Sequence, residues 1–101
     1  MASLTVLYWR DIPSEVIVKS GRQAAKRELS ERFIRAIDAA AMHAKARSDD
    51  AYLAEWRKSD PVTCGDDLEA EAEAAARRLE AEYDTHRLAL LAKQDGRESP
   101  A

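Results

Sequence analysis

The sequence predicts an α+β fold, in which an N-terminal β-hairpin packs against two long helices and one short helix. Two short runs rich in β-branched and aromatic residues open the chain, over residues 3–10 and 15–19. Two later stretches, residues 21–46 and 67–94, repeat their apolar residues at helical spacing. Alanine is frequent in both stretches, and it is the strongest helix former. Short strands followed by long helices are typical of the α+β class.

The first run predicts a strand that is covered on both faces, because apolar side chains alternate onto each of them. Leu4, Val6 and Tyr8 share one face, and Thr5, Leu7 and Trp9 share the other. Residues 11–14 (Asp-Ile-Pro-Ser) then favour a turn, since proline fixes φ and the polar side chains bond to the local backbone. Residues 15–19 return as the second strand of the hairpin.

Ser20 is typical of a helix N-cap, and Gln23 completes a capping box three positions later. We therefore expect the first long helix from Gly21 to Ala46. One face of it collects Ala25, Leu29, Phe33, Ala36, Ile37, Ala40 and Ala44. That stripe is the expected buried surface of the helix.

Residues 48–50 (Ser-Asp-Asp) interrupt the pattern and cap a short helix over residues 50–58. Pro61 follows its end, because the residue before a proline resists the α region. Residues 62–64 (Val-Thr-Cys) predict a short third strand.

The longest helix is expected over residues 67–94, where acidic residues in the first turns suit the helix dipole. Its apolar stripe runs along Leu68, Ala72, Ala75, Leu79, Tyr83, His86 and Leu90. Leu88 and Leu91 point away from that stripe, so they pack either into the core of their own domain or onto another chain. Residues 1–95 should form one domain, and residues 96–101 a disordered tail.

Composition narrows the class of protein. The 101 residues are 46% hydrophobic and 35% charged, as expected for a globular domain. No secretory signal and no membrane span are expected, and the single cysteine, Cys64, suits a reducing cytoplasm. We therefore expect a cytoplasmic protein.

Charge is divided unevenly along the chain. Residues 1–47 carry nine Lys and Arg against five Asp and Glu, a net +4, and residues 48–101 carry seven against fourteen, a net −7. A basic front and an acidic back can dock to each other or to partners. Nucleic-acid binding is not expected, because the whole chain carries −3 and its aromatic residues are not interleaved with lysines.

Three residues at the end of the first strand are candidates for binding a partner. Trp9, Arg10 and Asp11 could present an aromatic ring and a guanidinium to a ligand or a peptide. Alternatively, Trp9 packs under the long helix while Arg10 and Asp11 form an ordinary surface pair. Leu88 and Leu91 complete the set of candidate partner-binding residues.

A candidate anion site lies at the start of the first expected helix. Arg22 and Lys26 would project beside the free amides of Ser20 and Gly21. The alternative is that the aliphatic stems of both side chains cover a sheet edge while their charges stay in water.

The sequence predicts no catalytic residue, no metal site and no cofactor. His43 and His86 have no second histidine or cysteine at ligand spacing. Helix caps and solvated helix faces account for the many carboxylates. Cys64, beside a glycine, is more typical of a small core residue than of a nucleophile.

Four segments carry a resemblance to a known family: residues 5–13 (TVLYWRDIP), 28–33 (ELSERF), 36–40 (AIDAA) and 50–57 (DAYLAEWR). Over residues 4–90 the chain resembles the small bacterial virulence factor domain family, in particular its stand-alone proteobacterial-type members. The resemblance implies a relation to the C-terminal part of the larger conserved virulence factor C proteins, where similar domains lie beside an iron–sulfur-scaffold-like domain and helical repeats. It implies no catalytic residues.

Together these observations favour a non-enzymatic accessory protein that docks onto a larger assembly. The partner would be a protein of unknown identity, and a homo-oligomer is a second option. The corner at residues 9–13 and the first helix would form a basic contact surface, and the last helix an acidic one. The alternative function is a small-molecule or anion-binding protein, or an enzyme subunit, that uses Arg10, Arg22 and Lys26.

Overall fold

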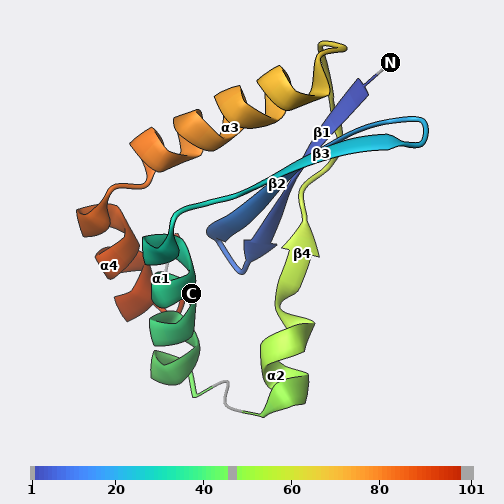
Figure 1. The fold of residues 1–101 in the computed structure, drawn as a ribbon. Coiled ribbons are helices and arrows are strands. Elements are labelled where there is room, and N and C mark those ends of the chain that lie inside the picture. Colours follow the sequence, from blue (N-terminus) through green and yellow to red (C-terminus); the bar gives the residue numbers. More distant parts are fainter. Residues whose placement is uncertain (1, 46–47, 99–101) are drawn as a thin grey trace.

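The computed structural model describes residues 2–45 and 48–98, which fold into a five-stranded antiparallel sheet and four helices (Figure 1). The strands are β1 (Ala2–Trp9), β2 (Ile12–Ser20), β3 (Gln23–Glu28), β4 (Trp56–Lys58) and β5 (Val62–Cys64). The helices are α1 (Glu31–His43), α2 (Asp49–Ala54), α3 (Leu68–Glu82) and α4 (Thr85–Lys93). The predicted α+β class is confirmed.

The sheet has the strand order β3-β2-β1-β4, and β5 also pairs with β1. The predicted hairpin is confirmed as β1 and β2, joined by a turn of only Arg10 and Asp11. Its register shifts between Leu7 and Tyr8, where Tyr8 pairs with Pro13. The predicted short strand over residues 62–64 is confirmed as β5.

The first predicted helix begins ten residues too early. Gly21 adopts a φ of +59°, and Ser20 pairs with Gln23 across a hairpin turn that leads into β3. Residues in β3 are good helix formers, but pairing with β2 and burial of Ala25 against α3 outweigh that preference. The helix α1 starts at Glu31 and ends at His43, and the expected end at residue 46 lies outside the described residues.

The last predicted helix is two helices. Tyr83 leaves the helical conformation, with φ −109° and ψ 75°, and the side chain of Asp84 accepts a hydrogen bond from the backbone N–H of Arg87. Asp84 is therefore the N-cap of a new helix, α4. The predicted short helix over residues 50–58 is also divided, because residues 56–58 pair with β1 as β4.

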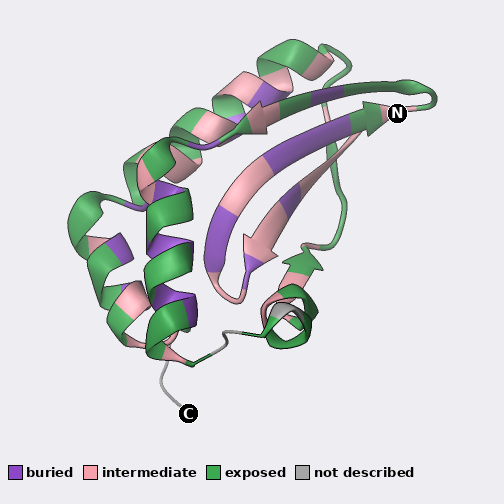
Figure 2. Ribbon diagram, turned by 60° about the horizontal axis from the view of Figure 1, so that its bottom comes forward, coloured by how far each residue is buried: buried purple, intermediate pink, exposed green. Residues whose placement is uncertain are grey.

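Helix α3 covers one face of the sheet, while α1 and α4 pack together at one end of it (Figures 1 and 2). The core under α3 joins small and β-branched side chains: Ala2, Val6, Val16, Val18, Ala25, Ala72 and Ala75. A second core fills the space between the sheet end, α1 and α4, and its largest members are Trp9, Ile12, Phe33, Ile37 and Leu91.

Residues 96–98 are packed onto the domain, although the sequence predicts a tail from residue 96. Gly96 is buried, and its carbonyl accepts a hydrogen bond from the N–H of Asp11 at 2.8 Å. Residues 99–101 of the expected tail lie outside the described residues.

Within the described part of the chain, no helix combines the length and the hydrophobicity that a membrane crossing requires.

Candidate docking groove

Trp9 packs inside the molecule. Its side chain is fully buried, its Nε1–H donates to the carbonyl oxygen of Tyr52 at 2.9 Å, and its ring stacks on Tyr52 with centroids 5.7 Å apart. Of the two alternatives, the structure therefore shows the packed one. In this conformation the ring is not exposed to a ligand or a partner.

Arg10 and Asp11 join three segments of the chain. Arg10 donates from Nη1 to the carbonyl of Asp95 at 2.8 Å and lies 3.4 Å from the carboxylate of Glu55. Asp11 accepts from Arg57 at 3.1 Å and from the backbone N–H of Glu98 at 2.7 Å. The polar groups of the corner therefore hold the hairpin turn, β4 and the C-terminal segment together.

Leu88 and Leu91 lie in the core of their own domain, with exposed fractions of 3% and 2%. The break at Asp84 rotates α4 relative to α3, so a residue off the α3 stripe can point inward. Of the two options that the sequence left open, the structure favours intramolecular packing.

Arg22 and Lys26 do not flank a helix N-terminus, so the geometry predicted for the anion site is wrong. Arg22 lies in the β2–β3 turn and Lys26 in β3, and both are exposed. Arg10 lies at the opposite end of β2, which is nine residues long and so spans about 30 Å. These three cations therefore do not converge on one pocket.

The histidines and the cysteine lie apart from one another. Nδ1 of His43 is 2.6 Å from Oδ1 of Asp95, and His86 is exposed rather than part of a buried stripe. Burial, with smaller contributions from Glu71 and Asp66, raises the pKa of the Cys64 thiol, which disfavours the thiolate. No cluster of three or more metal-ligating side chains occurs among the described residues.

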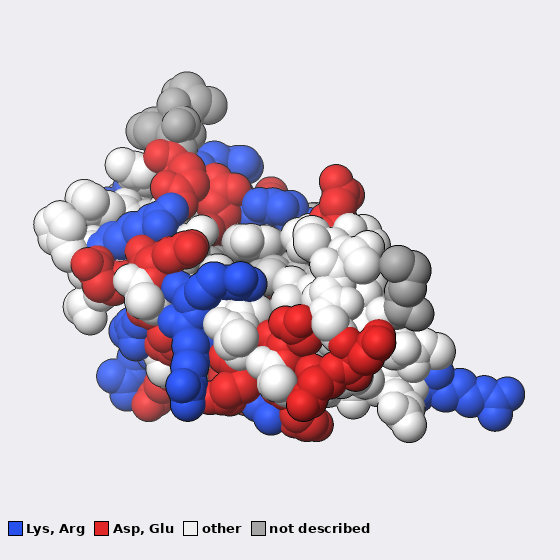
Figure 3. Space-filling view, turned by 90° about the horizontal axis from the view of Figure 1, so that it is seen from above, with Lys and Arg blue, Asp and Glu red and all other residues white. Residues whose placement is uncertain are grey.

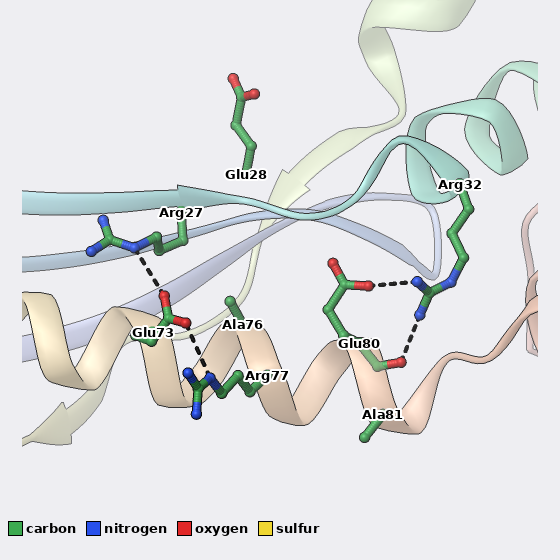
Figure 4. Close-up of a pocket in the computed structure, with 8 residues that line it drawn as sticks. All are labelled: Arg27, Glu28, Arg32, Glu73, Ala76, Arg77, Glu80 and Ala81. Atoms are coloured by element: carbon green, nitrogen blue, oxygen red, sulfur yellow. Dashed lines mark hydrogen bonds and ion pairs between the residues drawn. The ribbon is translucent and has the colours of Figure 1, made fainter.

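A charged cleft of about 530 Å³ lies between α3 and the segment that links β3 to α1 (Figure 4). Glu73 accepts from Arg27 at 3.3 Å and from Arg77 at 3.1 Å, while Arg32 pairs with Glu80 at 2.7 Å. Hydrogen bonds from Arg77, then Arg27, lower the pKa of Glu73. These arginines are already paired, so an anionic ligand would have to displace a carboxylate.

The same pairs show how the two halves of the chain dock. Arg27 also pairs with Glu69, so arginines of the basic front bind glutamates of the acidic α3. Figure 3 shows basic and acidic side chains interleaved on the face of the molecule that carries α3. The intramolecular docking that the charge pattern allowed is therefore present.

A different surface lies between α1 and α4, in a groove of about 490 Å³. It is lined by Arg32, Arg35, Ala36, Ala39, Thr85, Leu88, Ala89, Ala92 and Lys93. Its floor consists mainly of alanine side chains, of which Ala39 and Ala89 are exposed. Three cations and no carboxylate line it, so the groove is apolar at its centre and positive at its margins.

The sequence did not predict this groove, because it depends on the start of α4. A continuous helix over residues 67–94 would not place Ala89 and Ala92 beside α1. The signal was present in Asp84-Thr85, which is a good N-cap sequence inside an otherwise helical pattern.

A model of the virulence factor family matches residues 7–92, from within β1 to the last turn of α4. The chain belongs to this family. The resemblance over residues 4–90 is thus confirmed, and the family domain includes the elements that form both cores and the groove. No curated protein and no solved structure matches the chain.

Proposed function

We propose that this member of the virulence factor family is an accessory interaction domain, and that it receives an acidic amphipathic helix of a partner protein between α1 and α4. The observation that carries the proposal is the groove itself, which has an apolar floor and positive margins. The family match supplies the family alone, so the docking role rests on this geometry.

The shape of the groove suits a helix. Two helices pack side by side here, and a third helix can lie along the seam between them. Ala39, Ala89 and Ala92 have no side chain beyond Cβ, which lets a partner backbone approach closely. An amphipathic helix that lays its apolar face into such a groove is a common mode of recognition.

The charges suit an acidic partner. Arg35 is exposed, with an ion pair only to Glu31 one turn earlier on the same helix, at 3.0 Å. Such an exposed pair contributes little and can exchange for a partner carboxylate. Lys93 is exposed at the other margin. Complementary charge of this kind mainly raises the association rate and the specificity.

The proposal is tested with two synthetic helical peptides that share one leucine-rich face and differ in their flanks, glutamate in one and lysine in the other. We expect the glutamate peptide to bind more tightly, as measured by fluorescence anisotropy. The substitution Ala89→Glu should weaken its binding at least tenfold, because it places a carboxylate on the groove floor.

Ala74→Glu on the exposed side of α3 is the matched control, and it should bind as the wild type does. Both variants should keep the wild-type melting temperature, since both alanines are exposed. Equal binding of the two peptides, or unchanged binding by Ala89→Glu, would contradict the proposal.

A further inference from the structure

The face of the sheet that points away from α3 is not covered by a helix in the described part of the chain (Figure 2). Side chains alternate along each strand, and those of Val6, Val16 and Ala25 point into the core under α3. The strand register then places their neighbours on the open face in three rows. These rows are Lys58, Leu7, Glu15 and Glu28; then Thr5, Ile17 and Lys26; then Thr63, Ser3, Lys19 and Ala24.

The centre of this open face is apolar. Ile17 is only 8% exposed, yet it belongs to neither core cluster of the described residues. Its neighbours by register are Thr5 on β1 and Lys26 on β3. Leu7 lies in the adjoining row and is partly exposed.

The two ends of the open face carry opposite charge. Glu15 and Glu28 lie directly opposite each other at the end nearer α1, an arrangement of like charges that is unfavourable. Lys19 and Lys26 lie toward the β2–β3 turn. None of these four side chains takes part in an ion pair within the described part of the chain.

We propose that the open face binds a second copy of this chain, sheet against sheet, about a two-fold axis that lies in the face and runs across the strands. This operation reverses the strand direction of the second copy. The acidic end of each copy then meets the basic end of the other, and the two Ile17 side chains meet near the axis. The surface is thus self-complementary, as a two-fold dimer requires.

The size of the face sets the expected strength of the dimer. From Glu15 to the turn it extends about 20 Å, and four strands span about 19 Å. A footprint of roughly 400 Å² per copy is about half of that in a stable complex. The dimer is therefore weak, forms at high protein concentration, and dissociates as salt screens the charge pairs.

The test is a charge-swap experiment followed by sedimentation velocity at protein concentrations up to about 1 mM, where a Kd in the millimolar range is still visible. One variant carries Glu15→Lys with Glu28→Lys, and the other carries Lys19→Glu with Lys26→Glu. Each variant alone should be monomeric, because like charges then meet at both ends. An equimolar mixture should associate again, since every contact in the mixed dimer is complementary.

The matched control carries Asp60→Lys with Glu82→Lys, two exposed positions outside the open face that change the net charge by the same amount. It should associate as the wild type does. A wild type that stays monomeric at the highest concentration, or a mixture that associates no better than its components, would overturn the dimer. The groove between α1 and α4 contributes none of these residues, so this result is independent of the proposed docking of a helix.

Discussion

Gly96 illustrates how one residue can fix a chain terminus. Its φ is +83°, and a Cβ at this position would lie 3.1 Å from Cζ3 of the Trp9 ring. Only glycine combines this backbone conformation with such a close approach. The sequence predicted the turn chemistry around Trp9, but it could not show that a glycine 87 positions later closes over the ring.

The substitution Gly96→Ala should lower the free energy of unfolding by about 2–3 kcal/mol, because the methyl group adds a clash with Trp9 to the cost of a positive φ. Gly21→Ala is the matched control. It has a similar φ of +59° with no atom within 4 Å, and should cost only about 1 kcal/mol. Urea unfolding of both variants measures the difference, and equal losses would rule out the contact with Trp9.

Tyr83 gives the stability a dependence on alkaline pH. Burial, with a smaller contribution from Tyr8, raises the pKa of Tyr83 above its usual value. A group with a raised pKa in the folded state stabilises the fold below its unfolded pKa, and this stabilisation is lost as the pH rises toward the folded pKa. We expect the free energy of unfolding to fall above about pH 10.

Tyr83→Phe should reduce that loss, because the variant has no phenol to ionise at this position. Urea unfolding of both proteins at a series of pH values between about 8 and 11 provides the comparison. Parallel curves for the two proteins would show that Tyr83 does not contribute.

At the scale of elements, local signals predicted the hairpin and β5 but misplaced the helix starts. Ser20 and Gln23 satisfy the pattern of a capping box, yet Gly21 turns the chain into β3. The competing term is long-range, since β3 gains its stability from β2 and α3. No window of the sequence contains that information. The break at Asp84, in contrast, has a local signal that periodicity alone obscured.

Asp84→Ala should destabilise the protein by about 1 kcal/mol, because the first turn of α4 loses the acceptor for the N–H of Arg87. Asp84→Ser retains a capping oxygen and should recover most of that loss. Thermal unfolding followed by circular dichroism measures both variants. If Ser is no better than Ala, the cap is not what separates α3 from α4.

At the scale of the whole molecule, charge complementarity is used twice within the chain and remains available outside it. Arginines of the first half neutralise glutamates of α3, as the charge pattern allowed. The groove between α1 and α4 keeps a positive margin without a lining carboxylate. The sequence could predict an interaction protein, but the surface could not be located before α4 was placed. The five partner-binding candidates it offered lie in the corner and the core, and partner binding by them stays a prediction.

The most direct test of the docking account is a titration of the ¹⁵N-labelled protein with the glutamate-flanked helical peptide, followed by NMR. We predict that the largest chemical-shift changes map to Ala36, Ala39, Ala89 and Ala92, with smaller changes at Arg35 and Lys93. Changes centred on α3 or on the open sheet face, or no change at all, would contradict the claim that the groove between α1 and α4 is the docking site.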